Sequence, residues 1–350
     1  MSMGGYSIKK ISKLPVVRPS KFGGFARSLV FKMFSNIKVG SLTLREDDRK
    51  IVFGNRDVQS EPHAEVIIHD PGVYKSILTG GSIAAGETFI EGAWSSADLT
   101  EVTRTFSANL SILEAMSARQ NFLTRMALKL GHWGRKNTSE KSRQNIAAHY
   151  DLGNEFFSLF LDAKMMYSSA VFPDGCSNLA EASENKLRLI CEDLELRPED
   201  HLVEIGAGWG GMAIFAAEHY GCHVTTTTIS KEQLNYVKGE IIKRGLEKQI
   251  TVLFDDYRDL AGSFDKLVSI EMIEAVGHHF YDTYFQQVSR LLKPHGKALI
   301  QAITVPEQRY QQARDSVDFI KRYIFPGGCL PSVSIINLTV ARMTDMQMSG

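Results

Sequence analysis

The sequence predicts an α/β protein in which a doubly wound parallel sheet follows a small α+β domain. A β-prone run at 202–205 leads into a glycine-rich turn at 206–211, then into a helical pattern and a second β-prone run at 222–229. This order of strand, turn, helix and strand is typical of the first half of a nucleotide-binding sheet. Two more β-prone runs, 250–254 and 266–270, predict a third and a fourth strand.

The turn at 206–211 reads Gly-Ala-Gly-Trp-Gly-Gly. Glycine is needed where a ligand lies against bare backbone at a helix N-terminus. Gly206, Gly208 and Gly210 fit the GxGxG of methyltransferases that bind S-adenosylmethionine, but the same turn also satisfies the dinucleotide pattern GxGxxG. A dinucleotide site wants Asp or Glu about 20 residues on. The next strand ends at Ser230 without a carboxylate, which weakens the dinucleotide interpretation, although methyltransferases often carry an acid there as well.

Length and composition indicate an ordinary globular chain of about two domains. The 350 residues are 43% hydrophobic and 23% charged, with a formal net charge of zero. No apolar run approaches the ~20 residues of a membrane span, and residues 1–32 lack the pattern of a secretory signal. The four cysteines (Cys176, Cys191, Cys222, Cys329) are scattered without CxxC spacing. Neither a metal site nor a disulfide framework is indicated, and a reducing cytoplasm fits.

The N-terminal segment is basic. Residues 1–45 contain nine Lys or Arg and no acid, and in 25–34 apolar residues interleave with Arg27 and Lys32. We assign 1–36 to a basic tail with two interpretations. An amphipathic helix would be attracted to anionic lipid, each basic residue near the surface adding about 1 kcal/mol; otherwise the tail is solvated. No recognised nucleic-acid fold accompanies the charge, so no nucleic acid partner is expected.

A small N-terminal domain is expected at 37–134, followed by a polar linker at 135–144 and the main domain at 145–350. In chain order the expected elements of the small domain are a strand at 37–44, a turn-rich link at 45–55, a strand at 64–68, a helix from 73 to 78, glycine-marked turns within 80–92 and a helix at 110–130. This domain has no catalytic cluster of its own. Lipid docking or homodimer formation is assigned to it by analogy only.

Eight motifs appear in order along the second part of the chain: HYDLGNEFF, MMYSSAVF, GAGWGG, TISKEQ, DDYRDL, SIEMIEAVG, YDTYF and YIFPGGCLPS. Together they resemble the cyclopropane fatty acid synthase family, including its mycolic acid branch, over 145–334. The resemblance implies a class I methyltransferase (Rossmann-like) sheet. It also implies S-adenosylmethionine-dependent transfer to the double bond of an unsaturated acyl chain in a membrane phospholipid, by a cytoplasmic enzyme at the inner face of the membrane.

The resemblance also assigns the cofactor site. Tyr167 and Ser168 would contact S-adenosylmethionine, and Thr228 and Gln233 would bond its ribose and methionine portions. Asp256 at the end of the third strand can accept from the adenine amine, and Tyr257 beside it can stack on the ring. The full expected set is Tyr167, Ser168, Glu204, Gly206, Gly208, Gly210, Thr228, Gln233, Asp256 and Tyr257.

Methylation of an alkene determines what the catalytic site must contain. An alkene is a weak nucleophile, and its attack on the sulfonium methyl leaves a carbocation that must be shielded from water and then lose a proton. A dry cavity, a nearby anion and a modest base are therefore required. In the family that base is bicarbonate. The positions that would hold it here are Ser169, Glu274, Gln301 and the backbone at Ile303, and the match picks Glu274 rather than Glu271.

Two departures bear on the product. Ser169 stands where the family usually has Cys, and Gln301, where it usually has His, cannot carry a proton. A family Tyr belongs to a later segment, whereas this sequence ends soon after an apolar helix that follows Ser332. We therefore expect a C-terminally truncated catalytic domain without its last strands. Cyclopropane formation is the leading hypothesis; a branched or methylene product, or a non-catalytic lipid- or cofactor-binding remnant, stays open.

Overall fold

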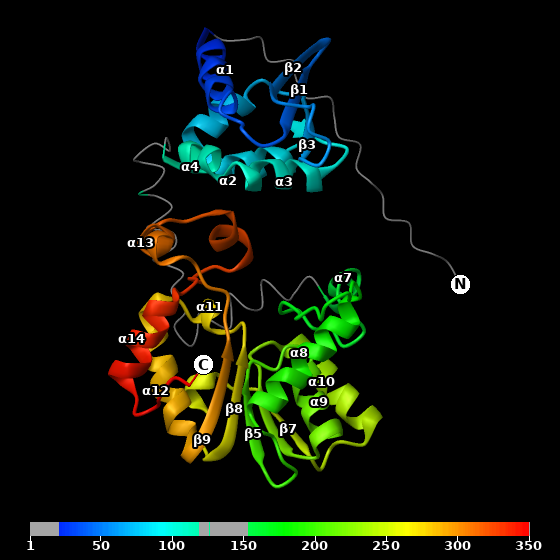
Figure 1. Cartoon of the computed structure of the whole chain (residues 1–350), viewed down its shortest axis with the longest axis vertical. Coiled ribbons are helices and arrows are strands. Elements are labelled where there is room, and N and C mark those ends of the chain that lie inside the picture. Colours follow the sequence, from blue (N-terminus) through cyan, green and yellow to red (C-terminus); the bar gives the residue numbers. More distant parts are fainter. Residues whose placement is uncertain (1–20, 119–125, 127–152, 350) are drawn as a thin grey trace, which may run out of the picture. The chain divides into compact units, whose positions relative to one another are not determined.

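The computed structural model describes residues 21–118, 126 and 153–349 (Figure 1). Contacts within the chain divide it into two compact units, residues 1–126 and 127–350. The expected linker at 135–144 lies outside the described residues. Within the described residues, no helix is long and apolar enough to cross a bilayer.

The first unit combines a four-stranded mixed sheet with helices. Its strand order is β2-β1-β3-β4; β1 pairs antiparallel with β2 and parallel with β3, and β3 pairs antiparallel with β4. Its elements are α1 (Lys21–Phe34), β1 (Ser41–Glu46), β2 (Arg49–Gly54), β3 (His63–Ile68), α2 (Val73–Ile90), β4 (Trp94–Ser95), α3 (Leu99–Ala108) and α4 (Leu110–Ala118). The unit is α+β, as expected.

Two expectations for this unit were wrong. The stretch 45–55 is not a link, because β2 lies within it and forms a hairpin with β1; the turn between them is tight, with Asp47 at φ 47°. The turns expected in 80–92 instead lie largely inside α2. That helix continues to Ile90 with a kink at Gly81, whose φ of 63° only glycine adopts readily.

Helix α1 corrects the expected boundary of the basic tail. Its apolar face is buried in the core of the first unit through Val30, Met33 and Phe34. The Arg27 guanidinium bonds both carboxylate oxygens of Glu46 on β1. Residues 21–36 therefore belong to the folded unit. The helix is amphipathic, but its apolar face packs on protein, and Arg27 is engaged by Glu46.

The second unit is a parallel five-stranded sheet with strand order β7-β6-β5-β8-β9. Its strands are β5 (His201–Ile205), β6 (His223–Thr227), β7 (Ile250–Leu253), β8 (Phe264–Ile270) and β9 (Leu292–Gln301). The order runs outward in both directions from β5 and β8, so the switch point lies between them, where open α/β sheets bind ligands beyond the carboxyl ends of the strands. The expected doubly wound sheet is confirmed. Further edge strands are not among the described residues.

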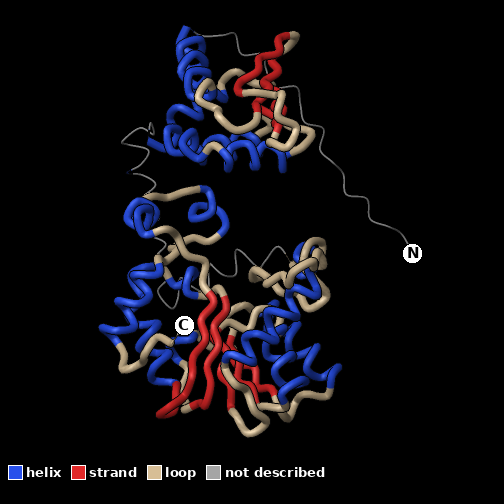
Figure 2. The backbone as a smooth tube through the Cα atoms, in the orientation of Figure 1, coloured by secondary structure: helices blue, strands red, loops and turns tan. Residues whose placement is uncertain are grey.

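Helices cover both faces of this sheet. In Figure 1, α8 (Leu179–Asp193), α9 (Gly211–Tyr220) and α10 (Lys231–Arg244) lie on one side, and α12 (Tyr281–Leu291) and α14 (Val333–Met343) lie on the other. Figure 2 shows the strands as the central layer. The apolar stripe expected at 187–194 is confirmed, since its four members are buried against α9.

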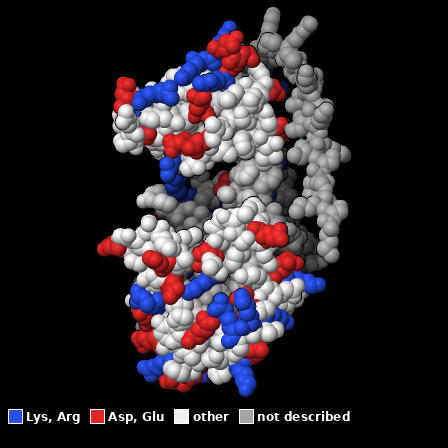
Figure 3. Space-filling model, turned by 90° about the vertical axis from the view of Figure 1, so that its right-hand side faces the viewer, with Lys and Arg blue, Asp and Glu red and all other residues white. Residues whose placement is uncertain are grey.

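Short elements gather near the carboxyl ends of the strands and in the loops that follow them. They are α7 (Asn154–Ser158), the 3-10 turn Tyr257–Asp259, α11 (Ile273–Val276), the 3-10 turn His278–Phe280, α13 (Glu307–Asp315) and the π-helical turn Ile320–Ile324. On the face of the molecule that Figure 3 shows, basic and acidic side chains are intermingled, in keeping with the zero net charge of the chain.

Candidate functional site

The glycine turn links β5 to α9 at the switch point. Gly206, Gly208 and Gly210 have φ values of 96°, 52° and 86°. A Cβ on Gly206 would lie 3.2 Å from Cγ of Met272, so the turn is also tightly packed against the segment that follows β8. Positive φ and close approach together explain the glycine pattern, and they leave bare backbone at the N-terminus of α9, where the sequence places the cofactor.

The segment 154–169, upstream of α8, lies against this turn, and we call it the cover. The Trp209 ring is buried against Phe157 and Tyr167, and its Nε1 donates to Oδ1 of Asn154 at 2.7 Å. A Cβ on Gly211 would lie 2.3 Å from Sδ of Met166, so glycine is required for the cover to approach. The expected contact residue Tyr167 thus lies beside the turn. Asn154 was not foreseen.

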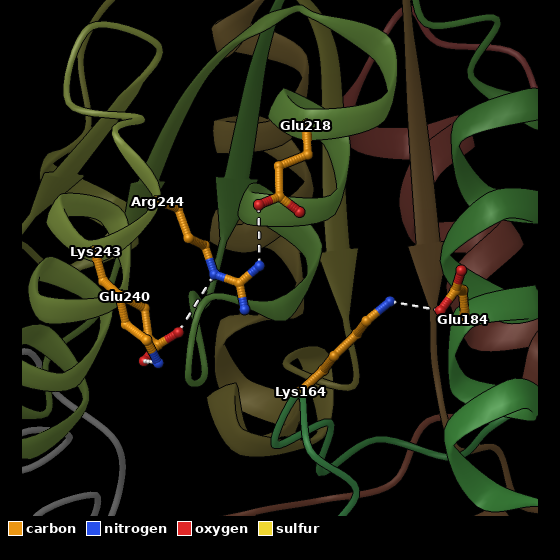
Figure 4. Close-up of polar contacts among 6 residues, drawn as sticks. All are labelled: Lys164, Glu184, Glu218, Glu240, Lys243 and Arg244. Carbon is orange, nitrogen blue, oxygen red and sulfur yellow. Dashed lines mark hydrogen bonds and ion pairs between the residues drawn. The ribbon is translucent and has the colours of Figure 1, made fainter.

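Ion pairs hold the surrounding helices at the surface. Lys164 of the cover reaches Glu184 of α8 at 2.7 Å. Arg244 of α10 reaches Glu218 of α9 at 2.9 Å and Glu240 at 3.3 Å (Figure 4). Exposed pairs of this kind contribute about 0–1 kcal/mol each. They link the helices around the site and are not part of the site itself.

Thr228 and Gln233, both expected to bond the cofactor, meet each other beyond the end of β6. The Thr228 hydroxyl donates to Oε1 of Gln233 at 2.8 Å and accepts from the Ser230 N–H at 3.1 Å. Ser230 caps α10, since its side chain accepts from the Gln233 N–H. Both predicted residues are buried. Their mutual bond fixes the amide of Gln233 and leaves its NH₂ group as the donor for a ligand.

At the end of β7 the two expected adenine-binding residues, Asp256 and Tyr257, are both buried. Asp256 is buried, and both its oxygens accept from the Arg258 guanidinium at 2.7 Å. The Tyr257 ring is only 7% exposed and packs edge-on against Tyr284 in the core. The buried ring therefore has no open face on which an adenine ring could stack. Phe254, 41% exposed at the same strand end, is the aromatic side chain that the sequence reading passed over.

Glu204 lies inside the sheet, away from the position its assignment required. It belongs to β5, and its carboxylate accepts from the Thr226 hydroxyl of β6 at 2.7 Å. Complete burial raises the pKa of this carboxyl to about 8. A neutral acid bonded to the neighbouring strand ties β5 to β6, and nothing in this contact reaches toward the glycine turn.

Ser169, Glu271 and Gln301 form a cluster at the carboxyl ends of β8 and β9. Oε1 of Glu271 accepts from the Ser169 N–H at 2.9 Å and from its hydroxyl at 2.7 Å. Nε2 of Gln301 donates to the same oxygen at 2.8 Å and to the Ser169 hydroxyl at 3.0 Å. We call this the Ser169–Glu271–Gln301 cluster. Ser169 and Gln301 were expected to lie together; the carboxylate between them was expected to be Glu274.

Glu274 instead pairs with Ile303. Its Oε1 accepts from the Ile303 N–H, and its Oε2 is buried without a hydrogen-bond partner among the described residues. Burial, opposed by the Ile303 N–H, raises the pKa of this carboxyl to about 7. The four expected catalytic residues are therefore divided into two neighbouring sets, one around each carboxylate.

Lys186 is a further functional candidate that the sequence reading missed. It is 2% exposed on α8, and its Nζ donates to the Ser168 hydroxyl at 2.6 Å. Burial lowers the pKa of this ammonium to about 8, against the attraction of Glu271 and Asp162. A signal existed, because Lys186 lies one position before Leu187, within the apolar face of the helix.

The residues at this site accommodate S-adenosylmethionine but do not fit a bicarbonate. The turn and the Thr228–Gln233 pair offer bare backbone and an amide to the cofactor. The donors that bicarbonate would need, by contrast, are engaged: Ser169 and Gln301 donate to Glu271, and Ile303 donates to Glu274. A third anion beside two carboxylates would meet like-charge repulsion.

Comparisons with known proteins agree with this geometry. The sequence model of the family described as mycolic acid cyclopropane synthetase matches residues 137–349. The chain is 35% identical over 290 residues to the tuberculostearic acid methyltransferase UfaA1 of Mycobacterium tuberculosis, covering 80% of this chain and 67% of that protein. It is 38% identical over 272 residues to the cyclopropane-fatty-acyl-phospholipid synthase of Escherichia coli K12, covering 77% and 68%.

Solved structures show the same fold. The cyclopropane synthase MmaA2 from Mycobacterium tuberculosis matches with a TM-score of 0.53 and 29% identity, over 57% of this chain and 74% of that one. The mycolic acid cyclopropane synthase CmaA1, complexed with SAH and CTAB, matches with a TM-score of 0.53 and 33% identity, over 57% and 73%.

Proposed function

Because this chain belongs to the mycolic acid cyclopropane synthetase family of S-adenosylmethionine-dependent methyltransferases, we propose that it alkylates the double bond of an unsaturated acyl chain in a membrane phospholipid and forms a cyclopropane. The observation that carries this proposal is the arrangement of two carboxylates, Glu271 and Glu274, beyond the end of β8, with Met272 between them packed against Gly206 of the turn.

When bound, S-adenosylmethionine supplies a methyl group made electrophilic by its sulfonium. The chain's own residues supply what the methyl acceptor needs. Phe157 and Met165 of the cover form a buried apolar cluster with Trp209 of the turn. Glu271 presents negative charge where positive charge develops, which is the usual means by which enzymes stabilise a charged transition state.

Exposed apolar side chains near the strand ends support an acyl substrate. Phe156, Leu159 and Phe160 in and after α7, and Phe172 after the cover, are each more than two-fifths exposed. Ile303, two positions after Gln301, is 48% exposed. Large apolar side chains gathered near one site are typical of a surface that meets lipid or another apolar partner.

A second candidate product is a branched or methylene acyl chain. Two substitutions favour it, Ser169 and Gln301, since both change the donors around the anion. Some relatives are named for fatty acid methylation, such as UfaA1 and a probable fatty acid methyltransferase of Pseudomonas putida, which is 30% identical. The branched or methylene product should therefore be distinguished from the cyclopropane by experiment.

The test is incubation of the purified chain with unsaturated phospholipid and S-adenosylmethionine carrying a CD₃ methyl, followed by gas chromatography and mass spectrometry of the fatty acid methyl esters. A cyclopropane retains two deuterons in a saturated ring. A methyl branch beside a new chain alkene retains all three. Absence of any deuterated acyl chain, with calorimetric binding of S-adenosylhomocysteine intact, would leave the non-catalytic remnant as the remaining interpretation.

A further inference from the structure

Three hydrogen-bond donors converge on a single oxygen of Glu271. They are the N–H and the hydroxyl of Ser169 and the amide of Gln301, all within 2.9 Å of Oε1. All three donors belong to two residues, Ser169 and Gln301, that the sequence resemblance assigned to an exogenous bicarbonate. The donors that would recognise a carboxylate-like anion are therefore filled by a carboxylate of the chain itself.

The backbone at Glu271 indicates that this placement is specific. Glu271 has a φ of 48°, in the left-handed region that residues other than glycine rarely adopt and that strains the backbone. The conformation is held because the Glu271 N–H donates to the Gln301 carbonyl at 2.8 Å. Glycine would adopt this conformation without strain. A glutamate at this strained backbone position, one residue before Met272, which packs against the glycine turn, indicates that its carboxylate has a function.

We propose that Glu271 replaces bicarbonate in this enzyme, both as the anion beside the carbocation and as the acceptor of the final proton. The inference rests on the proposed alkylation of an acyl double bond and names the base for it. Its electron balance is complete without a co-reactant. The alkene π pair forms a bond to the methyl carbon, while the carbon–sulfur pair leaves with sulfur as S-adenosylhomocysteine. A C–H pair of the transferred methyl then closes the ring, and its proton goes to the Glu271 carboxylate, which later releases it to solvent.

The surroundings distinguish Glu271 from Glu274. Glu274 is closed away, with one oxygen held by Ile303 and the other buried, and burial raises the pKa of its carboxyl to about 7. Glu271 is half-buried, and its charge acts on two neighbours. Burial lowers the pKa of Lys186 while Glu271 raises it; for Tyr167, burial and the Glu271 charge both raise the pKa. Lys186 is thus a buried cation that supports a negative charge at Glu271.

Two measurements test the proposal. The first is the rate of transfer in buffer purged of carbon dioxide, with and without added bicarbonate. We expect the wild-type rate to be the same in both, and Glu271→Gln to lose about 10²- to 10³-fold, the usual cost of removing one such electrostatic group. Added bicarbonate should restore part of the rate of Glu271→Gly, in which the donors are vacated and the backbone strain is relieved. Glu199→Gln, an exposed glutamate before β5 at the opposite end of the strand, is the matched control.

The second measurement does not depend on lipid chemistry. Broadening of the ¹³C resonance of labelled bicarbonate, with S-adenosylhomocysteine present, should be seen with Glu271→Gly and not with the wild-type chain. Wild-type binding or wild-type dependence on bicarbonate overturns the proposal, as does a Glu271→Gln enzyme with an undiminished rate or a Glu271→Gly protein that binds no bicarbonate. If the chain transfers no methyl to any lipid, the proposed function fails, but the ¹³C experiment still decides which anion the donors hold.

Discussion

A single carboxylate oxygen of Glu271 accepts from both the backbone N–H and the hydroxyl of Ser169, at 2.9 and 2.7 Å, across 102 positions of sequence. The bonds join the cover segment to the end of β8. Because Ser168, the preceding residue, accepts from buried Lys186, the cover is fixed at two successive residues by groups of opposite charge. The segment that lies against the glycine turn is therefore the same segment that bonds the Glu271 carboxylate.

Lys186 should matter through its charge. Burial lowers the pKa of its ammonium to about 8, so the lysine loses its proton as the pH rises through that value, and the rate of transfer should fall with it. Lys186→Arg keeps the charge at all accessible pH and should remove this alkaline limb, whereas Lys186→Met should lower kcat at every pH. The measurement is the pH–rate profile of the three proteins.

The same group gives a stability prediction of definite sign. Between pH 8 and about 10.4 the lysine binds more protons in the unfolded state than in the folded state. The free energy of unfolding of the wild-type protein should therefore rise with pH over this range, compared with that of Lys186→Met. Lys238→Met, at an exposed position of α10, serves as the control. If the rate and the stability of Lys186→Met depend on pH as those of the wild type do, the charge of Lys186 has no role in either.

The ion pair of Arg27 with Glu46 should stabilise the first unit. The Glu46 carboxylate accepts from the Arg27 guanidinium and from the buried Tyr74 hydroxyl. These bonds hold the pKa of Glu46 below its ordinary value despite the opposing effect of burial. The stabilisation is thus present above the unfolded pKa and lost as the pH falls through the folded one.

Glu46→Gln should lower the melting temperature at pH 7, with a loss of roughly 1–3 kcal/mol for a part-buried charged hydrogen bond. It should also flatten the acid limb of stability between pH 3 and 5. Glu65→Gln removes a more exposed pair with Arg45 and should change the melting temperature much less. Equal effects from the two substitutions, followed by circular dichroism, would count against a special role for the Glu46 contacts.

Local patterns in the sequence predicted the frame of the site. The glycine turn at 206–210 and the positions of Thr228 and Gln233 after the second strand were predictable, because each depends on a turn or on a strand followed by a helix cap, within a few residues. The sheet order follows from the same units, since parallel strands need helical crossovers. The stripe at 187–194 was read correctly for the same reason.

The partner of each polar group could not be read in this way. Whether Ser169 meets Glu271 or Glu274 depends on side chains 102 or more positions apart and on a left-handed backbone at one of them. Tyr257 was misassigned because a ring at a strand end can face the ligand or the core, and only the packing against Tyr284 decides. For α1, the sequence left an amphipathic helix and a solvated tail as alternatives, and it could not say which surface the apolar face of such a helix would cover.

The buried carboxyl of Glu274 should make the stability of the protein depend on pH. Burial raises the pKa of its carboxyl to about 7, above the ordinary value of 4.5. The folded state therefore binds more protons between these values, and the free energy of unfolding should fall as the pH rises from 5 to 7. Glu274→Gln keeps an acceptor for the Ile303 N–H and removes the titration. We expect it to be more stable than the wild type at pH 8, by on the order of 1–3 kcal/mol, in thermal melts across this range. A lower stability at pH 8 would contradict the assignment.

Membrane recruitment should depend on the part of the basic tail that precedes α1. We propose that Lys9, Lys10 and Lys13, which lie outside the described residues, attract the chain to anionic bilayers. Co-sedimentation with anionic vesicles should fall as salt rises, since exposed charges are screened over a Debye length of ~8 Å at physiological ionic strength. It should fall again when the three lysines become Ala. Changing Lys231, Lys238 and Lys248 on and near α10 instead should have little effect, and binding indifferent to both salt and the tail would favour the solvated-tail interpretation.

Gln301 should influence which product forms. Its amide bonds both the Ser169 hydroxyl and Oε1 of Glu271, so it fixes the direction from which the carboxylate meets the carbocation. A His at this position can share a proton near neutral pH, whereas Gln cannot titrate there. Proton loss from the transferred methyl closes a cyclopropane, while proton loss from a neighbouring chain carbon gives an alkene beside a methyl branch. We therefore expect Gln301→His, alone and with Ser169→Cys, to change the ratio of two-deuteron to three-deuteron esters in the CD₃ experiment by several-fold, with affinity for S-adenosylhomocysteine unchanged. If every form gives the same cyclopropane in the same yield, the direction of the carboxylate does not select the carbon that loses its proton.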